Sequence, residues 1–161
     1  MKKQQFLVPY TEYDSLNELH PSDRALIEQA ISATSGSYAP YSRFSVGAAL
    51  RLTDGTIVCG SNQENVAYPS GLCAERTALF YAGSRYPDQK VEAIAIAARN
   101  EQGQLSPQPI TPCGACRQVM QETALRHAQP IRCLLYGTQK IILIENALNL
   151  LPLSFSAEQM L

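Results

Sequence analysis

The sequence carries almost no net charge and has no extended basic stretch. Its 161 residues include 13 Lys and Arg against 14 Asp and Glu, which gives a formal net charge of −1. The longest basic run is Lys2-Lys3. Nucleic-acid-binding proteins usually carry a basic patch, because contacts with phosphates dominate their affinity. We therefore expect no nucleic-acid partner.

Long apolar runs are missing as well. No stretch approaches the ~18 apolar residues of a membrane span, so we expect no membrane partner. The first residues begin like a signal peptide, but their apolar segment from Phe6 to Pro9 is too short for the hydrophobic region of one. The chain has five cysteines, so disulfide pairing would leave one cysteine unpaired. We expect a cytoplasmic protein whose thiols bind metal.

Internal repeats, low-complexity tracts and interdomain linkers are also absent. A chain of this length is the size of one domain, and its 45% hydrophobic residues are enough for a single core. Residues 1–20 form an N-terminal lead-in, whose aromatic side chains we expect on the surface or against a partner subunit. We expect a single domain over residues 21–161.

The hydrophobic pattern predicts helices and strands that alternate along the chain. The expected elements are a helix from Ser22 to Ser35, a hairpin of 44–52 and 56–60 around Asp54-Gly55, a helix over 74–81, a strand over 91–98, a helix over 113–127, strands over 131–136 and 140–144, and a short helix over 146–150. Alternating helices and strands after an opening hairpin indicate a mixed α/β sheet with helices on its faces.

Three of the cysteines form a split motif. Cys73 opens the sequence Cys-Ala-Glu-Arg, and Cys113 and Cys116 follow about forty residues later in Pro-Cys-Gly-Ala-Cys. Three sulfur ligands describe a zinc ion with one open position, which is typical of catalytic rather than structural zinc. Both motifs fall where a loop meets the N-terminus of a helix, a place that stabilises thiolates.

Two charged residues follow Cys73 directly. Glu75 is two positions away and does not face the same metal on a helix, but its carboxylate can approach a water in the open position. Arg76 is three positions away and lies on the same helix face, where it can donate to the ligand sulfurs. Three thiolates leave one excess negative charge on the zinc site, which Arg76 would offset. The alternative is a solvent-facing arginine.

Less specific interpretations of these residues stay open. A Cys-x-x-Cys pair alone is more often a structural zinc half-site or a redox pair. Cys59 and Cys133 lie in apolar strands, and we interpret both as core residues. If either were a fourth ligand, the zinc would be closed and the protein could be a structural or binding module. His20 and His127 fall outside the motifs, and we do not expect them to be ligands.

Further stretches combine with the cysteine motifs into a family pattern. They are Tyr41 to Leu50 (YSRFSVGAAL), Asn62 to Asn65 (NQEN), Cys73 to Ala78 (CAERTA), Pro112 to Gln118 (PCGACRQ) and Leu151 to Phe155 (LPLSF). With them the chain resembles the small homotetrameric cytidine deaminases that act on free nucleosides. The resemblance runs from about Ser37 to Leu161 and implies a three-layer α/β/α fold with a mixed five-stranded sheet. Gln63 departs from the family, which commonly has an aliphatic residue there.

The resemblance implies a zinc-dependent hydrolase with one Zn²⁺ per subunit. Cys73, Cys113 and Cys116 would hold the zinc, and Glu75 would be the catalytic proton shuttle. Glu75 would take a proton from zinc-activated water, hydroxide would attack C4 of cytosine as N3 is protonated, and the amine would leave as ammonia. Cytidine and deoxycytidine would become uridine and deoxyuridine, a reaction of pyrimidine salvage.

The same resemblance implies the substrate contacts. Phe44 would stack on the pyrimidine, Asn62 and Glu64 would bind the ribose hydroxyls, and the backbone of Ala74 would contact the pyrimidine edge. Unless the family pattern applies, Phe44 is by default a strand core residue. Two other functions stay open at this point: a deaminase of another aminopyrimidine nucleoside, and a zinc-stabilised nucleic-acid-binding module.

The resemblance also implies self-association. Tyr68 and Phe155 match positions that reach across subunit boundaries to neighbouring sites, although either could simply be a packing aromatic. The apolar tail around Leu151 should be buried in the fold or in a neighbour. We expect a homotetramer.

Overall fold

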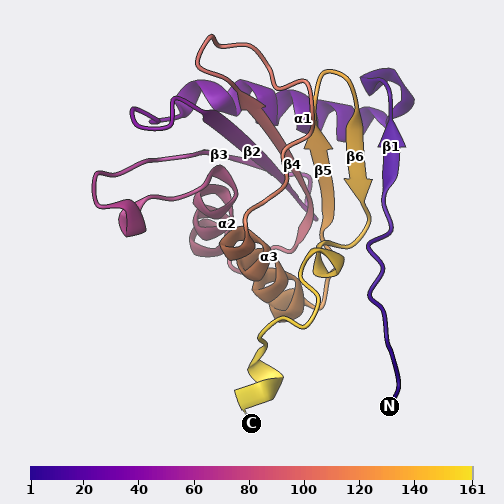
Figure 1. The fold of residues 1–161 in the computed structure, drawn as a ribbon. Coiled ribbons are helices and arrows are strands. Elements are labelled where there is room, and N and C mark those ends of the chain that lie inside the picture. The colour runs from indigo at the N-terminus through magenta and orange to yellow at the C-terminus, as the bar shows by residue number, and fades with distance from the viewer. Residues whose placement is uncertain (161) are drawn as a thin grey trace.

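The computed structural model describes residues 1–160, and its centre is one six-stranded sheet with helices on both faces (Figure 1). The strands are β1 (Thr11–Tyr13), β2 (Ser45–Leu52), β3 (Ile57–Ser61), β4 (Val91–Arg99), β5 (Arg132–Tyr136) and β6 (Ile141–Ile144). Their order across the sheet is β1-β6-β5-β4-β2-β3. Only the β4–β5 pair of this sheet is parallel, so the predicted mixed sheet is confirmed.

The sheet has six strands rather than the expected five, and the additional strand comes from the N-terminal lead-in. Thr11 pairs with Leu143 and Tyr13 with Ile141, antiparallel. Lys140 Nζ also lies 3.3 Å from a carboxylate oxygen of Glu12. A strand of three residues is too short to show the alternation by which strands are recognised in a sequence.

Helix α1 (Pro21–Ala33) covers one face of the sheet. Its buried residues Leu26, Ile27 and Ala30 pack against a strand surface made largely of alanines, including Ala49 and Ala95. Small strand residues let the helix backbone approach the sheet closely. The helix begins before the expected Ser22, because His20 is its N-cap and accepts a hydrogen bond at Nδ1 from the Ser22 N–H at 3.3 Å.

Helices α2 (Ala74–Arg85) and α3 (Gly114–His127) cover the opposite face. Leu79 of α2 and Met120 of α3 are buried there with Leu50, Ile94 and Ile96 of the sheet. The predicted three-layer α/β/α fold is therefore confirmed. Helix α2 extends past its expected end to Arg85. No helix within residues 1–160 is both long and apolar enough to cross a membrane.

Five short 3-10 helices complete the described part of the chain: η1 (Leu16–Glu18), η2 (Thr34–Gly36), η3 (Tyr68–Ser70), η4 (Ala147–Leu150) and η5 (Ala157–Met160). Helix η2 follows α1 directly, and η3 lies in the loop between β3 and α2. Gly60 lets α2 lie against β3, because a Cβ there would come within 2.6 Å of the Ala78 backbone nitrogen. This close packing fixes the N-terminus of α2 beside the end of β3.

Candidate active site

Three cysteine sulfurs meet where α2 and α3 begin. The Sγ atoms of Cys73 and Cys113 are 3.8 Å apart, and those of Cys113 and Cys116 are 3.4 Å apart. Thiolates held at about 2.3 Å from a tetrahedral ion are themselves separated by roughly 3.8 Å. The cluster therefore fits a zinc ion. Within residues 1–160, no histidine, carboxylate or further cysteine joins these three, so one position of the ion stays open.

The helix termini explain why the sulfurs converge. Cys73 is the N-cap of α2 and Cys113 is the N-cap of α3, while Cys116 lies in the first turn of α3. Helix N-termini favour negative charge nearby. Hydrogen bonding with Cys116 lowers the pKa of Cys73 to about 5, and Arg76 acts in the same direction. The same hydrogen bonding, together with burial, raises the pKa of Cys116. A thiolate is the form of cysteine that binds metal.

Glu75 is buried directly behind this cluster. Only 4% of its surface is exposed, although it is a carboxylic acid in the first turn of a helix. Burial raises the pKa of Glu75, and the negative charge of Cys73 adds to this effect. Its carboxylate oxygens do not belong to the metal-binding group, in agreement with the helix geometry used above. The site thus places a buried carboxylic acid beside three sulfurs without making it a ligand.

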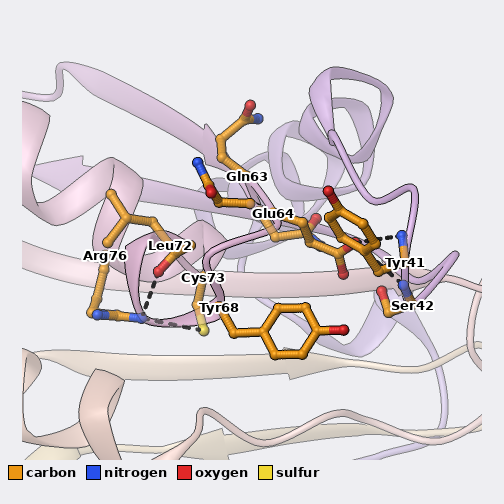
Figure 2. A pocket seen from close by; sticks show the side chains of 11 residues that line it. Tyr41, Ser42, Gln63, Glu64, Tyr68, Leu72, Cys73 and Arg76 are labelled. Carbon is orange, nitrogen blue, oxygen red and sulfur yellow. Dashed lines mark hydrogen bonds between the residues drawn. The ribbon is translucent and has the colours of Figure 1, made fainter.

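Arg76 lies with its guanidinium close to the sulfurs, as predicted. Its Nη2 atom is 4.0 Å from Cys73 Sγ and 3.5 Å from the carbonyl oxygen of Gly71 (Figure 2). Its Nε atom is buried without a hydrogen-bond partner among the described residues. The positive charge therefore lies at the cluster and not in solvent.

A cavity of about 540 Å³ opens beside Cys73. Its lining brings together five of the predicted site residues: Asn62, Glu64, Tyr68, Cys73 and Arg76. Figure 2 shows Cys73 and Arg76 on one side of this cavity and Tyr41 and Ser42 on the other. The loop before β2, the segment after β3 and the start of α2 therefore meet at one pocket.

Glu64 is held in this pocket by the loop before β2. One of its carboxylate oxygens accepts hydrogen bonds from the backbone N–H groups of Tyr41 at 2.9 Å and Ser42 at 3.2 Å. Hydrogen bonds from the Ser42 side chain and from these backbone groups lower the pKa of Glu64. The ring of Tyr41 also packs edge-on against Tyr68, with 6.0 Å between centroids. Tyr41 and Ser42 belong to one of the family stretches, but their contact with Glu64 was not predicted.

Phe44 does not line the cavity and is not a core residue. It precedes β2 with 36% of its surface exposed. The chain turns just before it at Arg43, whose φ of 54° lies in the left-handed region that non-glycine residues seldom adopt. Its backbone N–H donates to Ser42 Oγ at 3.1 Å, and its carbonyl accepts from Asn62 Nδ2 at 2.9 Å. The default interpretation as a strand core residue is wrong.

Ala74 and Phe155 also lie outside the cavity lining, as do the cluster residues Glu75, Cys113 and Cys116. Ala74 is fully buried at the start of α2. Phe155 is 61% exposed, and its carbonyl accepts hydrogen bonds from Gln118 at 2.8 Å and Gln121 at 3.4 Å. The C-terminal segment leaves the body of the fold below α3 (Figure 1). The chain's own pocket therefore does not include the Phe155 ring.

The two remaining cysteines differ in their surroundings. Cys133 is fully buried in β5, as expected. Cys59 is exposed, so its assignment to the core is wrong. Along β3, Val58 and Gly60 are the buried residues, and alternation turns Cys59 to the other side. A short apolar run does not reveal which of its residues face the core.

Arg117 is a site neighbour that the sequence analysis did not single out. Its guanidinium donates to the carbonyl oxygens of Pro112 at 2.8 Å and Leu150 at 2.9 Å. It thus connects the loop before Cys113 to the start of the C-terminal tail. Its place directly after Cys116 in a motif was the only available signal.

Comparisons with known proteins agree with this geometry. The family model "Cytidine and deoxycytidylate deaminase zinc-binding region" matches residues 20–129, which include all three clustered cysteines. A cytidine deaminase from Halalkalibacterium halodurans is 43% identical over 135 residues, which cover 84% of this chain and 95% of that relative.

Solved structures give the same result for the fold. The crystal structure of cytidine deaminase from Burkholderia pseudomallei has a TM-score of 0.69 and 41% identity, covering 81% of this chain and 97% of that one. The cytidine deaminase from Mycobacterium tuberculosis has a TM-score of 0.64 and 32% identity, with 82% and 95% covered.

Proposed function

This chain belongs to the cytidine and deoxycytidylate deaminase family, and we propose that it hydrolyses cytidine and deoxycytidine to uridine and deoxyuridine with release of ammonia. One observation carries the proposal. Three sulfurs at zinc-binding distances leave one position open, and a buried glutamate that is not a ligand lies directly beside them. This is the arrangement that zinc deaminases use on cytosine.

Cys73, Cys113 and Cys116 would hold the zinc. When bound, the ion supplies Lewis acidity and lowers the pKa of water toward neutrality. Arg76 offsets the excess negative charge of the three thiolates through its approach to Cys73 Sγ. The helix N-termini at Cys73 and Cys113 act in the same direction.

Glu75 carries the protons of the reaction. Its carboxylate accepts one proton from the attacking water and delivers it to N3 of the pyrimidine. The second proton of that water passes through the same carboxylate to the leaving 4-amino group, which departs as ammonia. Burial keeps bulk water away from this carboxylate, so the protons go to the substrate.

The pocket beside the cluster takes the nucleoside. Glu64 presents a carboxylate to the sugar hydroxyls while the loop at Tyr41 holds it in place. Asn62 contacts the sugar from the end of β3. Phe44 stacks on the pyrimidine from the rim, and the backbone of Ala74 contacts the pyrimidine edge.

The active form is a homotetramer in the cytoplasm, working in pyrimidine salvage. Exposed aromatic residues support self-association: Tyr68 and Phe155 are 77% and 61% exposed, and Phe80 and Tyr81 are exposed on α2. Cys113 is also exposed, so one side of the cluster is open in a single chain. None of the five cysteines, all within the described residues, forms a disulfide, which suits a reducing compartment.

Replacing the proposed proton carrier tests the function. Purified wild-type protein should release ammonia from cytidine and deoxycytidine and contain one zinc per chain. Glu75→Gln should fold and keep its zinc, but lose about 10³-fold in kcat, because proton transfer contributes typically 10²–10⁴-fold. Glu122→Gln, on the exposed side of α3, is the matched control and should keep wild-type activity. A Glu75→Gln enzyme within ten-fold of wild type would refute the proposed role.

A further inference from the structure

The side chain of Asn62 forms three hydrogen bonds with other groups of the chain. Its Oδ1 atom accepts hydrogen bonds from Ser37 Oγ at 2.6 Å and from the Val46 backbone N–H at 2.8 Å. Its Nδ2 atom donates to the carbonyl oxygen of Phe44 at 2.9 Å. An amide side chain has two acceptor positions and two donor hydrogens. Three of the four are therefore used, and one N–H of Nδ2 is left for a ligand.

The partners of Asn62 also determine which way its amide points. A backbone N–H can only donate and a carbonyl can only accept, so Oδ1 faces Val46 and Nδ2 faces Phe44. The Ser37 hydroxyl has one proton, and Oδ1 of Asn62 is its acceptor. Ser37 thereby completes the acceptor side of Asn62 and restrains rotation of the amide.

Ser37 reaches Asn62 from outside the nucleoside pocket. It follows η2 and is among the residues lining a separate hollow that also includes Arg43 and Arg99, whereas Asn62 lines the nucleoside pocket. The next residue, Tyr38, donates its backbone N–H to the Asn62 carbonyl at 3.0 Å. Ser37 is thus held beside Asn62 by backbone pairing, and it acts on the pocket only through that amide.

We propose that Ser37 is a positioning residue for sugar recognition: its hydroxyl holds the Asn62 amide so that the free N–H of Nδ2 points to a sugar hydroxyl of the nucleoside. The inference rests on the proposed function, because it assumes a nucleoside in the pocket. In this proposal the Ser37 hydroxyl does not touch the substrate. Ser37 lies in the segment after α1, far from both cysteine motifs in the sequence.

Removal of the Ser37 hydroxyl should weaken binding of the sugar and leave the chemistry intact. Without this bond, Oδ1 keeps the Val46 N–H and Nδ2 keeps the Phe44 carbonyl, so the amide holds its orientation but is restrained less tightly toward the sugar. A single neutral hydrogen bond of this kind corresponds to roughly a three- to ten-fold change in affinity. The change should appear in KM, because the bond acts on substrate binding and not on Glu75.

The experiment measures steady-state kinetics of four enzymes on two substrates. The enzymes are wild type, Ser37→Ala, Ser37→Thr and Ser45→Ala; Ser45 lines the same hollow as Ser37 and makes no side-chain hydrogen bond within the described residues. The substrates are cytidine and 2′,3′-dideoxycytidine, which keeps the 5′-hydroxyl but lacks the 2′- and 3′-hydroxyls that the Asn62 amide would contact. Ser37→Ala should raise KM for cytidine about three- to ten-fold with kcat within two-fold of wild type.

The dideoxy substrate isolates the sugar contact. On it, Ser37→Ala should change kcat/KM less than two-fold, because the contact is already missing. Ser37→Thr keeps a hydroxyl and should restore the KM for cytidine, and Ser45→Ala should match wild type. Equal losses on both substrates, or a Ser37→Ala enzyme that matches Ser45→Ala, would overturn the positioning role. Wild-type protein inactive on cytidine would instead refute the proposed function itself.

Discussion

At the scale of single residues, Arg76 places a positive charge beside the cysteine cluster. Its Nη2 lies 4.0 Å from Cys73 Sγ, and its buried Nε has no partner within residues 1–160. A guanidinium in this position stabilises thiolates over thiols, and thiolates are the metal-binding form. The affinity of the site for zinc should therefore depend on this side chain.

Arg76→Gln should weaken zinc binding by about ten-fold, as is typical when a group that supports metal ligands is removed. Zinc content after dialysis against increasing chelator concentrations measures this effect. Arg85→Gln, in the last turn of the same helix and exposed, is the control and should keep wild-type zinc retention. Equal zinc loss in the two variants would show that Arg76 has no specific effect on the cluster.

The residues of the site were predictable where a motif or helix spacing marks them, and contacts with residues outside the motifs were not. Glu75 and Arg76 directly follow Cys73, so helix geometry alone indicated their relation to the metal. Ser37 lies 25 positions before Asn62, and their contact depends on how η2 packs beside the end of β3. Nothing in the local sequence indicates that packing.

At the scale of elements, a buried ion pair network fixes α1 on the sheet. Asp23, in the first turn of α1, accepts from Arg51 of β2 at 3.0 Å and from Arg132 of β5 at 2.9 Å. Its side chain is 4% exposed. Burial opposes ionisation of Asp23, but hydrogen bonds from Arg132 and Arg51 outweigh it and hold the pKa of this carboxyl below its usual value.

Asp23→Asn should lower the free energy of unfolding by about 3 kcal/mol near pH 7, because it leaves two arginines without their buried counter-ion. Because the folded pKa is lowered, the contribution of Asp23 is fully present above its unfolded pKa of about 4 and is lost as pH falls through the folded value. The difference between wild type and variant in urea unfolding should thus shrink below about pH 4. Asp88→Asn, in an exposed loop, should change stability little at any pH.

The long elements were predictable, and the shortest one was not. Helices α2 and α3 and strands β2 to β6 lie where periodicity and turn residues indicated, apart from their ends. Strand β1 has three residues and is stabilised by pairing with β6, so its formation depends on a distant segment and not on its own pattern. The N-cap of α1 is His20 for a different, local reason, since Pro21 at the first helical position favours a start there.

At the scale of the whole molecule, the aromatic side chains of Tyr68 and Phe155 are exposed. Phe155 is held on α3 through its carbonyl while its side chain stays exposed. If the ring serves a neighbouring subunit, activity depends on residues from two chains. Two damaged chains should then complement each other.

Phe155→Ala alone should lose about ten-fold in kcat/KM, and Glu75→Gln alone nearly all activity. Oligomers reassembled from equal amounts of the two variants should regain up to about a quarter of wild-type activity, because some sites combine an intact Glu75 with a neighbour's intact Phe155. Activity of the mixture equal to the average of the separate variants would show that Phe155 acts within its own chain. Sedimentation of the wild-type protein should show a tetramer.

The pairing of β1 with β6 affects how the protein is made. Thr11 and its partner Leu143 are 132 positions apart, with every other strand of the sheet except β6 itself lying between them in the sequence. Domains tend to fold as units during synthesis, and contacts between distant segments form late. The edge strand β1 can therefore join the sheet only after the strands between it and β6 have been synthesised.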